Sequence, residues 1–132
     1  MAGAAHVIET RVEDNRVIVN AIEPRGAWAE WDGARIHLSV NGQGVWELKK
    51  KLARHLHLPK EAVRVTNPDV GGGFGMKGQT YPEHYVLAAA ARKLGRPVRW
   101  MSERTEGMLT DNAGRDLVSV TRLAFDENHR IT

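Results

Sequence analysis

Residues 85–91 read Tyr-Val-Leu-Ala-Ala-Ala-Ala, and a helix built from them is apolar on nearly every side. Such a helix must be covered on more than one side, because apolar side chains are stabilised when they leave water. A chain of 132 residues is long enough to bury one core and too short for two. The sequence therefore predicts a single domain over residues 1–132, and it allows part of the helix cover to come from another chain or domain.

Two signals bound this helix. Thr80 and Glu83 have the spacing of a capping box, and Pro82 lies near the first turn, where its missing N–H costs little. Gly95 follows the apolar run, and glycine is the residue type that most often ends a helix. We expect the helix to run from around Pro82 to Gly95.

An amphipathic helix is predicted earlier in the chain. Its apolar residues recur at helical spacing, at Val45, Leu48, Leu52 and Leu56. Glu47 is placed to pair with Lys51 one turn later, and Pro59 marks the end of the helix.

Runs rich in β-branched and aromatic residues predict the strands. These runs are residues 16–22, 27–31, 35–40, 62–66, 98–101 and 117–125. Asp32-Gly33 is a strong hairpin signal, so the first three runs are expected to form an antiparallel unit, and residues 126–129 are expected to turn the chain after the last run. This order of elements predicts an α+β fold with a mixed sheet and two main helices.

Composition excludes several classes of site. The chain has no cysteine, so it has no disulfide, no thiolate nucleophile and no sulfur-ligated metal of its own. No apolar run approaches the roughly 20 residues that a membrane-spanning helix needs, and the first residues do not resemble a signal peptide. We expect no membrane partner and a cytoplasmic location.

The basic residues and the two histidines in and just after the amphipathic helix are not interpreted as a binding site. The net charge is only +3, and the cluster at residues 49–51 with Arg54 is typical of a solvated helix face, so no nucleic-acid partner is expected. His55 and His57 lie two positions apart and therefore point to different sides of a helix, which argues against a shared metal site. We predict no metal ligand in the chain.

Residues 70–78, Val-Gly-Gly-Gly-Phe-Gly-Met-Lys-Gly, are the segment that most needs a chemical explanation. Consecutive glycines allow positive φ angles and let a ligand approach the peptide N–H groups. Such a loop can hold an anion. It can equally be a tight connection in which the glycines meet steric demands alone.

Two nucleotide-binding motifs compete for this loop. A P-loop needs glycine before the lysine and serine or threonine after it, yet Met76 and Gly78 occupy those positions. The dinucleotide motif is met formally by Gly73, Gly75 and Gly78, with Glu103 placed where a ribose-binding acid would be sought. The chain is too short for the paired halves of a dinucleotide fold, so a small nucleotide-binding protein is a weak hypothesis.

A third interpretation depends on several separated motifs. In chain order they are Glu23-Pro-Arg25, Gly42-Gln43, Val63-Arg-Val65, Pro68-Asp-Val-Gly-Gly-Gly-Phe-Gly-Met-Lys77, Tyr81-Pro-Glu83, Leu94-Gly-Arg-Pro-Val-Arg-Trp100, Glu103-Arg-Thr-Glu106 and Gly114-Arg115. Together they resemble the molybdenum hydroxylase large subunits, which include xanthine dehydrogenase, aldehyde oxidase and the aerobic carbon monoxide dehydrogenase type. The resemblance covers nearly the whole chain, and it implies part of the molybdopterin-binding domain of that family.

The resemblance also implies a cofactor and a reaction class. Gly73, Phe74 and Gly75 are expected to contact the molybdenum cofactor, molybdopterin, with Gly72 as an adjacent contact. The complete enzyme is expected to be an oxidoreductase that hydroxylates a carbon centre with oxygen from water, with electrons leaving through iron-sulfur clusters and usually flavin. Its expected partners are the remainder of the large subunit, the iron-sulfur and flavin subunits or domains, and a small-molecule substrate.

The family's catalytic glutamate lies far downstream in a much longer subunit. The resemblance therefore assigns no catalytic residue to this chain, which is expected to be a fragment that is inactive alone. Whether the fragment holds the cofactor unaided is left open. A second hypothesis is a non-catalytic module derived from the domain, which pairs with itself as a homo-oligomer or with a partner through the surface that the missing part would cover.

Overall fold

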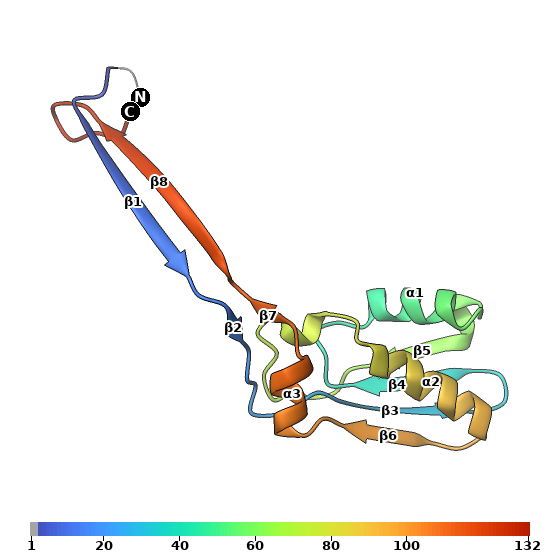
Figure 1. Ribbon diagram of the computed structural model, residues 1–132. Coiled ribbons are helices and arrows are strands. Elements are labelled where there is room, and N and C mark those ends of the chain that lie inside the picture. The colour runs from blue at the N-terminus through green and yellow to red at the C-terminus, as the bar shows by residue number, and fades with distance from the viewer. Residues whose placement is uncertain (1–2) are drawn as a thin grey trace. The chain divides into compact units, whose positions relative to one another are not determined.

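The structure, a computed structural model, describes residues 3–132, and they form two compact units. One unit is Ile18–Asn112, and the other combines the two ends of the described chain, up to Val17 and from Ala113 onward (Figure 1). Length and composition predict one compact unit. The chain divides into two because its terminal strands pair with each other and contribute no residue to the main hydrophobic core.

The central unit is built on a four-stranded mixed sheet. The strand order is β5 (Val63–Thr66), β4 (Ile36–Val40), β3 (Gly26–Trp31) and β6 (Val98–Met101). β3 pairs antiparallel with both β4 and β6, while β4 and β5 are parallel. The hairpin predicted at Asp32-Gly33 is confirmed, as are the α+β class and the mixed sheet.

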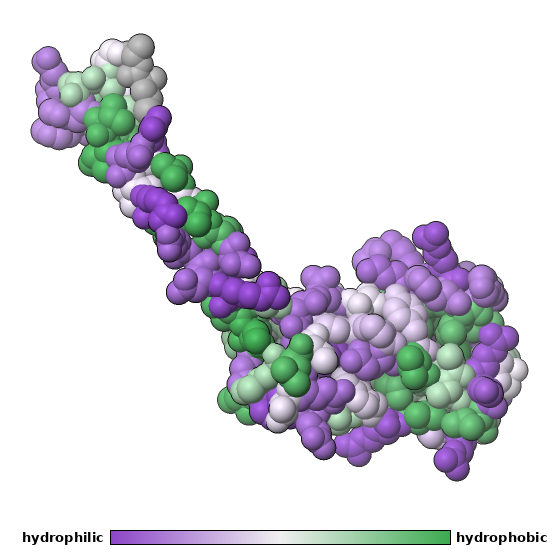
Figure 2. Space-filling model, in the orientation of Figure 1, coloured by the Kyte–Doolittle hydropathy of each residue, from purple (hydrophilic) through white to green (hydrophobic). Residues whose placement is uncertain are grey.

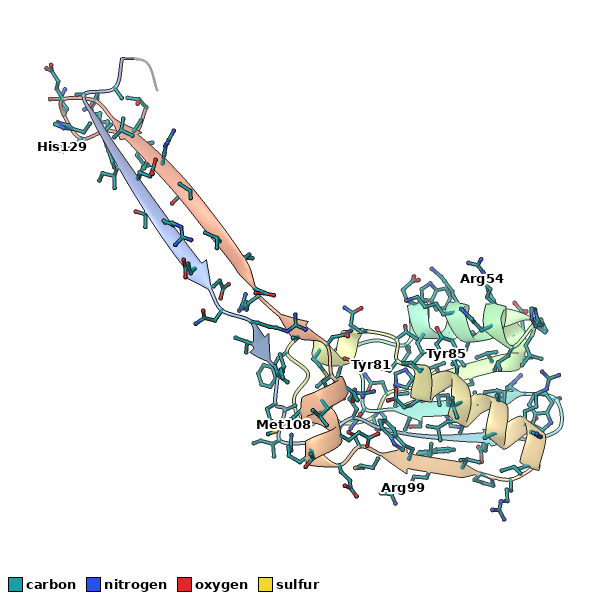
Figure 3. All side chains as sticks on the ribbon, in the orientation of Figure 1. Arg54, Tyr81, Tyr85, Arg99, Met108 and His129 are labelled. Carbon is teal, nitrogen blue, oxygen red and sulfur yellow. The ribbon has the colours of Figure 1, made fainter. Side chains whose placement is uncertain are left out.

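Two helices cover one face of this sheet, α1 (Trp46–His55) and α2 (Pro82–Leu94) (Figure 1). The core between them contains Ala27, Ala29, Ile36, Leu38, Val40, Leu48, Leu52, Ala53, Val63, Val65, Leu87, Ala88 and Ala91. Small side chains on β3 and on α2 let the helix approach the strand closely. His55 at the end of α1 and Tyr85 on α2 pack their rings 4.7 Å apart, with Tyr85 between the two helices (Figure 3).

The predicted boundaries of α2 are largely confirmed, but the predicted capping box is wrong. Gly95 ends the helix with φ +60°, as expected. At the start, the N–H of Tyr81 donates to Nδ1 of His84, while the hydroxyl of Thr80 accepts from Lys51. Glu83 does not fold back on the helix start, because its carboxylate binds Arg25 instead.

Burial on α2 is more one-sided than its composition predicts. Leu87, Ala88 and Ala91 are buried against the sheet, whereas Val86 is exposed. The amphipathic helix α1 is confirmed, but the predicted pairing of Glu47 with Lys51 is wrong, since Glu47 pairs with Lys50, 2.7 Å away.

The sequence patterns did not predict several elements correctly. The predicted strand at 16–22 is reduced to β2 (Val17–Ile18), and the long first strand is β1 (His6–Asp14), where charged residues between the apolar ones conceal the alternation. The short helix α3 (Arg104–Thr110) was not predicted either, because a seven-residue helix carries little periodicity. The remaining elements are η1 (Lys60–Ala62), η2 (Met76–Gly78) and β7 (Ala113–Gly114).

The terminal unit is a two-stranded antiparallel ribbon, called the terminal ribbon below, in which the first and last strands of the chain pair. β1 pairs with β8 (Leu117–Phe125) along its whole length, from His6 opposite Phe125 to Asp14 opposite Leu117. The turn predicted at 126–129 is confirmed, because the carboxylate of Asp126 accepts from the N–H groups of Asn128 and Arg130. No helix among residues 3–132 is long and apolar enough to cross a membrane.

The core makes a direct prediction. Leu52 on α1 is fully buried between helix and sheet, so Leu52→Ala should lower the free energy of unfolding by about 2–5 kcal/mol. Leu94→Ala, at an exposed position of α2, is the control and should change it by less than about 0.5 kcal/mol. Urea unfolding followed by circular dichroism measures both, and equal losses would contradict the placement of the core.

Candidate functional site

The glycine-rich segment is an exposed turn with unusual backbone angles. Gly72, Phe74 and Gly75 have φ angles of +95°, +52° and +86°. Phe74 is the only non-glycine residue among these, and its side chain is 75% exposed. A phenylalanine in the left-handed region is rare and costs free energy, which makes the turn a candidate functional feature.

Glu23 anchors the beginning of the turn. One carboxylate oxygen accepts from the N–H of Gly71 at 2.8 Å and from Nζ of the buried Lys77 at 2.9 Å, while the N–H of Glu23 donates to the carbonyl of Gly71. Burial alone would raise the pKa of Glu23, but Lys77 and the N–H of Gly71 outweigh it, so this pKa lies below its usual value. Glu23 is therefore held as a charged carboxylate beneath the turn.

Gln43 anchors the end of the turn. Its Oε1 accepts from the N–H of Gly75 at 2.8 Å, and its own N–H donates to the carbonyl of Lys77. Gln43 also lines a hollow of about 400 Å³ beside the first turn of α1, so its side chain is open to solvent. Because its oxygen is engaged with Gly75, the amide NH2 group remains free to donate to a ligand.

Steric demands explain part of the glycine content. A Cβ at Gly71 would lie 2.6 Å from Cβ of Glu23, and a Cβ at Gly73 would lie 2.5 Å from the Gln43 side chain. The two anchoring side chains thus need glycine opposite them. A Cβ at Gly75 would meet no protein atom within 4 Å, so close packing does not explain that glycine.

The two anchors leave the middle of the turn open. Within the described chain, the N–H groups of Gly72, Gly73 and Phe74 donate to no protein acceptor, whereas those on either side are engaged. Consecutive free N–H groups in a turn form a partial positive site for an anion. The turn presents this site beside the exposed Phe74 ring.

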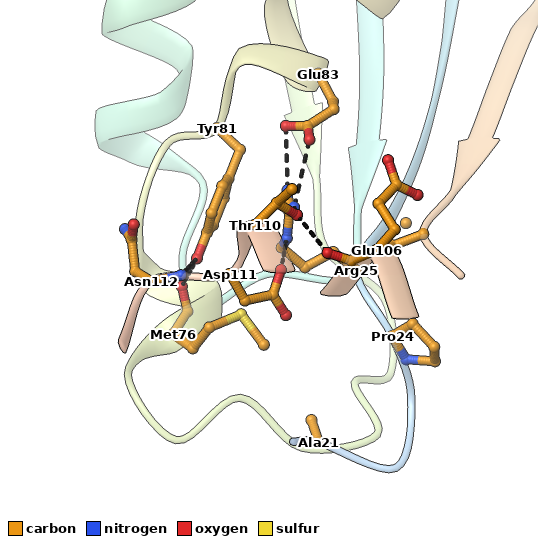
Figure 4. A network of polar contacts seen from close by, with 12 residues as sticks. Ala21, Pro24, Arg25, Met76, Tyr81, Glu83, Glu106, Thr110, Asp111 and Asn112 are labelled. Atoms are coloured by element: carbon orange, nitrogen blue, oxygen red, sulfur yellow. Dashed lines mark hydrogen bonds and ion pairs between the residues drawn. The ribbon is translucent and has the colours of Figure 1, made fainter. Parts of the chain in front are cut away.

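A buried arginine, Arg25, holds together the segments next to the turn. Arg25, 2% exposed, binds Glu83 through two hydrogen bonds of 3.1 and 3.3 Å, and its Nε donates to Asp111 (Figure 4). It also donates to the hydroxyl of Thr110 at 3.1 Å, and its guanidinium lies 3.7 Å from the ring centre of Tyr81. One side chain therefore joins the entry to β3, the start of α2 and the end of α3.

Tyr81 connects Arg25 to the glycine turn. Its hydroxyl donates to the carbonyl of Met76 at 3.0 Å and accepts from the N–H of Asn112 at 3.2 Å (Figure 4). Tyr81 is buried, and burial raises the pKa of its hydroxyl, so the group remains a neutral donor. Tyr81 immediately precedes α2, and Figure 3 labels it beside the start of that helix.

His84 completes the buried layer. Burial and the nearby charge of Arg25 lower the pKa of His84 to about 4, so the imidazole is neutral at pH 7. Since its Nδ1 accepts from the N–H of Tyr81, the ring proton lies on Nε2. The neutral ring avoids a second cation next to the guanidinium.

The comparisons with known proteins decide between the interpretations of this loop. Residues 1–132 match the model of the molybdopterin cofactor-binding domain. The chain belongs to this family. The resemblance predicted from the separated motifs is thereby confirmed, and the nucleotide-binding alternatives are not supported.

Relatives of the chain are parts of molybdenum enzymes or of oxidoreductase complexes. The chain is 37% identical over 131 residues to the 6-hydroxypseudooxynicotine dehydrogenase complex subunit gamma of Paenarthrobacter nicotinovorans, covering 98% of this chain and 16% of the relative. It is 38% identical over 112 residues to the aldehyde oxidoreductase molybdenum-binding subunit of Escherichia coli strain K12, covering 85% of this chain and 15% of the relative. The chain thus spans about a sixth of the length of these relatives.

Solved structures show the same fold. Quinoline 2-oxidoreductase from Pseudomonas putida 86 is similar with a TM-score of 0.87 and 33% identity, over 98% of this chain and 17% of that one. A copper- and molybdenum-containing carbon monoxide dehydrogenase is similar with the same TM-score and 28% identity, over 98% of this chain and 17% of that one. The fold described above is therefore that of part of a molybdopterin-binding domain.

The structure brings together residues that the sequence singled out separately. Glu23, Gln43 and Lys77 come from three of the matched motifs and meet at the glycine turn. The supporting layer of Arg25, Glu83 and Asp111 was not predicted, although Arg25 and Glu83 lie in matched motifs. The candidate ribose-binding acid Glu103 lies instead at the start of α3, where its N–H donates to Glu106.

The buried His84 predicts a pH dependence. Its pKa of about 4 in the folded chain lies below its usual value of 6.5, so the unfolded chain binds a proton that the folded chain does not. Stability is full above about pH 6.5 and falls by roughly 3 kcal/mol as the pH approaches 4. Because the pKa of Glu83 and that of Glu23 are lowered from 4.5, their losses begin at lower pH.

Urea unfolding at intervals from pH 7.5 to pH 4.5 measures this effect. His84→Gln should flatten the decline, since glutamine still accepts from Tyr81 and carries no titrating proton. His57→Asn removes an exposed imidazole and should leave the decline intact. A wild-type free energy of unfolding that stays constant over this range would rule out a buried neutral His84.

Proposed function

We propose that the chain acts as a cofactor-holding segment in the large subunit of a molybdenum hydroxylase, with the turn at Gly72, Gly73, Phe74 and Gly75 in contact with the molybdenum cofactor. The observation that carries this proposal is the set of three free N–H groups, which Glu23 and Gln43 leave open from either side. The family match and the relatives named as molybdenum-binding subunits support the identity of the ligand.

The donors present fit such a group. N–H groups of the turn can donate to oxygen or sulfur ligands of a metal, and Gly75 leaves space for close approach because no protein atom lies near its missing side chain. The amide NH2 of Gln43 adds a further donor at the same end of the turn. The Phe74 ring, held outward, provides an apolar wall that excludes water from one side.

When bound, the molybdenum cofactor supplies the oxidation chemistry, in which water-derived oxygen is transferred to carbon. The residues of this chain would hold and orient the group rather than move protons. Glu23 is engaged by Lys77 and Glu83 by Arg25, so neither carboxylate is free to act as a base. We place the general base, the small-molecule substrate contacts and the iron-sulfur and flavin partners outside residues 1–132.

The two compact units are proposed to belong to one domain of that subunit. The family model spans residues 1–132 without a break, although the contacts divide the chain. The cytoplasm is the proposed location, in keeping with a chain that has no cysteine.

A matched pair of glycine substitutions tests the cofactor contact. Gly75 and Gly33 both have positive φ, at +86° and +101°, and at neither position would an added Cβ meet a protein atom within 4 Å. Alanine at either position should cost a similar backbone strain of about 1 kcal/mol. In the complete subunit, Gly75→Ala should lower bound molybdenum by roughly tenfold, because its methyl group would occupy the space of the ligand.

Molybdenum is measured by mass spectrometry of metals per mole of purified subunit, and released pterin is measured by fluorescence. Gly33→Ala is the control and should retain wild-type molybdenum. Wild-type molybdenum content in both variants would count against the proposed contact. Equal loss in both would mean that backbone strain, and not ligand contact, governs the cofactor content.

A further inference from the structure

The two faces of the terminal ribbon, formed by β1 and β8, differ in chemistry. Cross-strand partners share a face, so the pairs Ile8 with Leu123, Thr10 with Thr121 and Val12 with Ser119 lie together on one face. We call this the uncharged face, and Asp14 and His6 lie only at its ends. The opposite, charged face contains Glu9, Arg11, Glu13, Arg122, Val7, Val118, Val120 and Ala124.

Ion pairs keep the charged face suited to water. Arg122 pairs with Glu9 across the strands, and Arg11 pairs with Glu13 along β1. The uncharged face has no such groups, and its apolar side chains Ile8, Val12 and Leu123 are exposed. Figure 2 shows apolar residues along the terminal ribbon. Burying the uncharged face would therefore desolvate no charge in its middle, whereas burying the other face would.

The terminal ribbon needs a covering layer for its own stability. Two antiparallel strands alone are at best marginally stable in water, and almost every residue of β1 and β8 is exposed. The solved quinoline 2-oxidoreductase matches 98% of this chain within a chain about six times as long. The fold that includes the terminal ribbon is therefore retained where much more protein is present.

The size of the face argues for a covalently linked occupant. Nine residues at a rise of about 3.3 Å and two strands about 10 Å wide give a face of roughly 300 Å². Stable interfaces between separate chains bury about 800 Å² on each partner. A second copy of the chain, docked through this face alone, would fall well short of that area, whereas a linked segment loses less freedom on docking.

We propose that the uncharged face of the terminal ribbon, formed by Ile8, Thr10, Val12, Ser119, Thr121 and Leu123, is the docking surface for an apolar, uncharged layer from the remainder of the same large subunit. This inference rests on the proposed function, in which the chain is a segment of that subunit. It adds which face of the terminal ribbon is buried and which stays in water.

Hydroxyl-radical footprinting of the wild-type complete subunit tests the proposal without any variant. Ile8, Val12 and Leu123 should react at least about fivefold more slowly than Val118 and Val120 on the charged face of the same subunit, after correction for intrinsic side-chain reactivity, because a covered side chain loses its solvent contact. Equal reactivity of the two faces, or protection of the charged face alone, would overturn the proposal. So would protection of Ile8 and Val12 that rises with the concentration of the complete subunit, since a second copy would then be the occupant.

A matched pair of valines provides the variant test. Val12 on the uncharged face and Val118 on the charged face are 51% and 56% exposed, so lysine at either site is tolerated by the chain itself. In the complete subunit, Val12→Lys should speed amide exchange in β1 and β8 by roughly tenfold, because a covered lysine cannot stay solvated. Val118→Lys should leave exchange unchanged. A subunit that fails to fold with Val12→Lys but folds with Val118→Lys supports the same face, and equal effects contradict it.

The same preparations separate this inference from the proposed function. Molybdenum bound in wild-type subunit whose uncharged face reacts freely would refute the docking surface alone. A protected face in a subunit that binds no molybdenum would refute the proposed cofactor site alone.

Discussion

The buried guanidinium of Arg25 is the interaction on which the central unit depends. A cation with almost no solvent contact must be matched by charges and hydrogen bonds, and Glu83, Asp111 and Thr110 supply them. Because these partners come from α2 and from the end of α3, the charge match fixes how those segments meet β3. The Tyr81 ring packs on the same guanidinium and passes the constraint on to Met76, at the end of the glycine turn.

The glycine turn is held at its two ends and has free N–H donors in its middle, so it can bind a ligand. Glu23 and Gln43 use their side-chain oxygens to hold the N–H groups of Gly71 and Gly75. Gly71 and Gly73, which lie against these two side chains, are explained by close packing. The N–H groups between these anchors donate to no acceptor within the described chain. A rigid frame with free donors is the arrangement expected of a preorganised ligand site, since little ordering remains to be done on binding.

Regular elements with strong patterns could be predicted from the sequence, and contacts between distant residues could not. The spacing of Leu48 and Leu52 predicted α1, and the position of Gly95 predicted the end of α2. The capping box at Thr80 and Glu83 failed because a local pattern cannot reveal that Arg25 competes for the carboxylate. In the same way, the motif resemblance included Glu23 and Gln43 but gave a role only to Phe74 and the glycines. A motif could not show that these two side chains hold the N–H groups of Gly71 and Gly75.

In the proposed cofactor site, the N–H groups of Gly72, Gly73 and Phe74 donate to the cofactor. Amide hydrogen exchange of these three groups, compared in cofactor-loaded and cofactor-free complete subunit, measures that contact most directly. We expect fast exchange in the cofactor-free subunit and exchange slowed by at least about tenfold in the loaded one, because each donor then has an acceptor. Exchange at the same rate in both states, with Gly75 protected in each by Gln43, would contradict it.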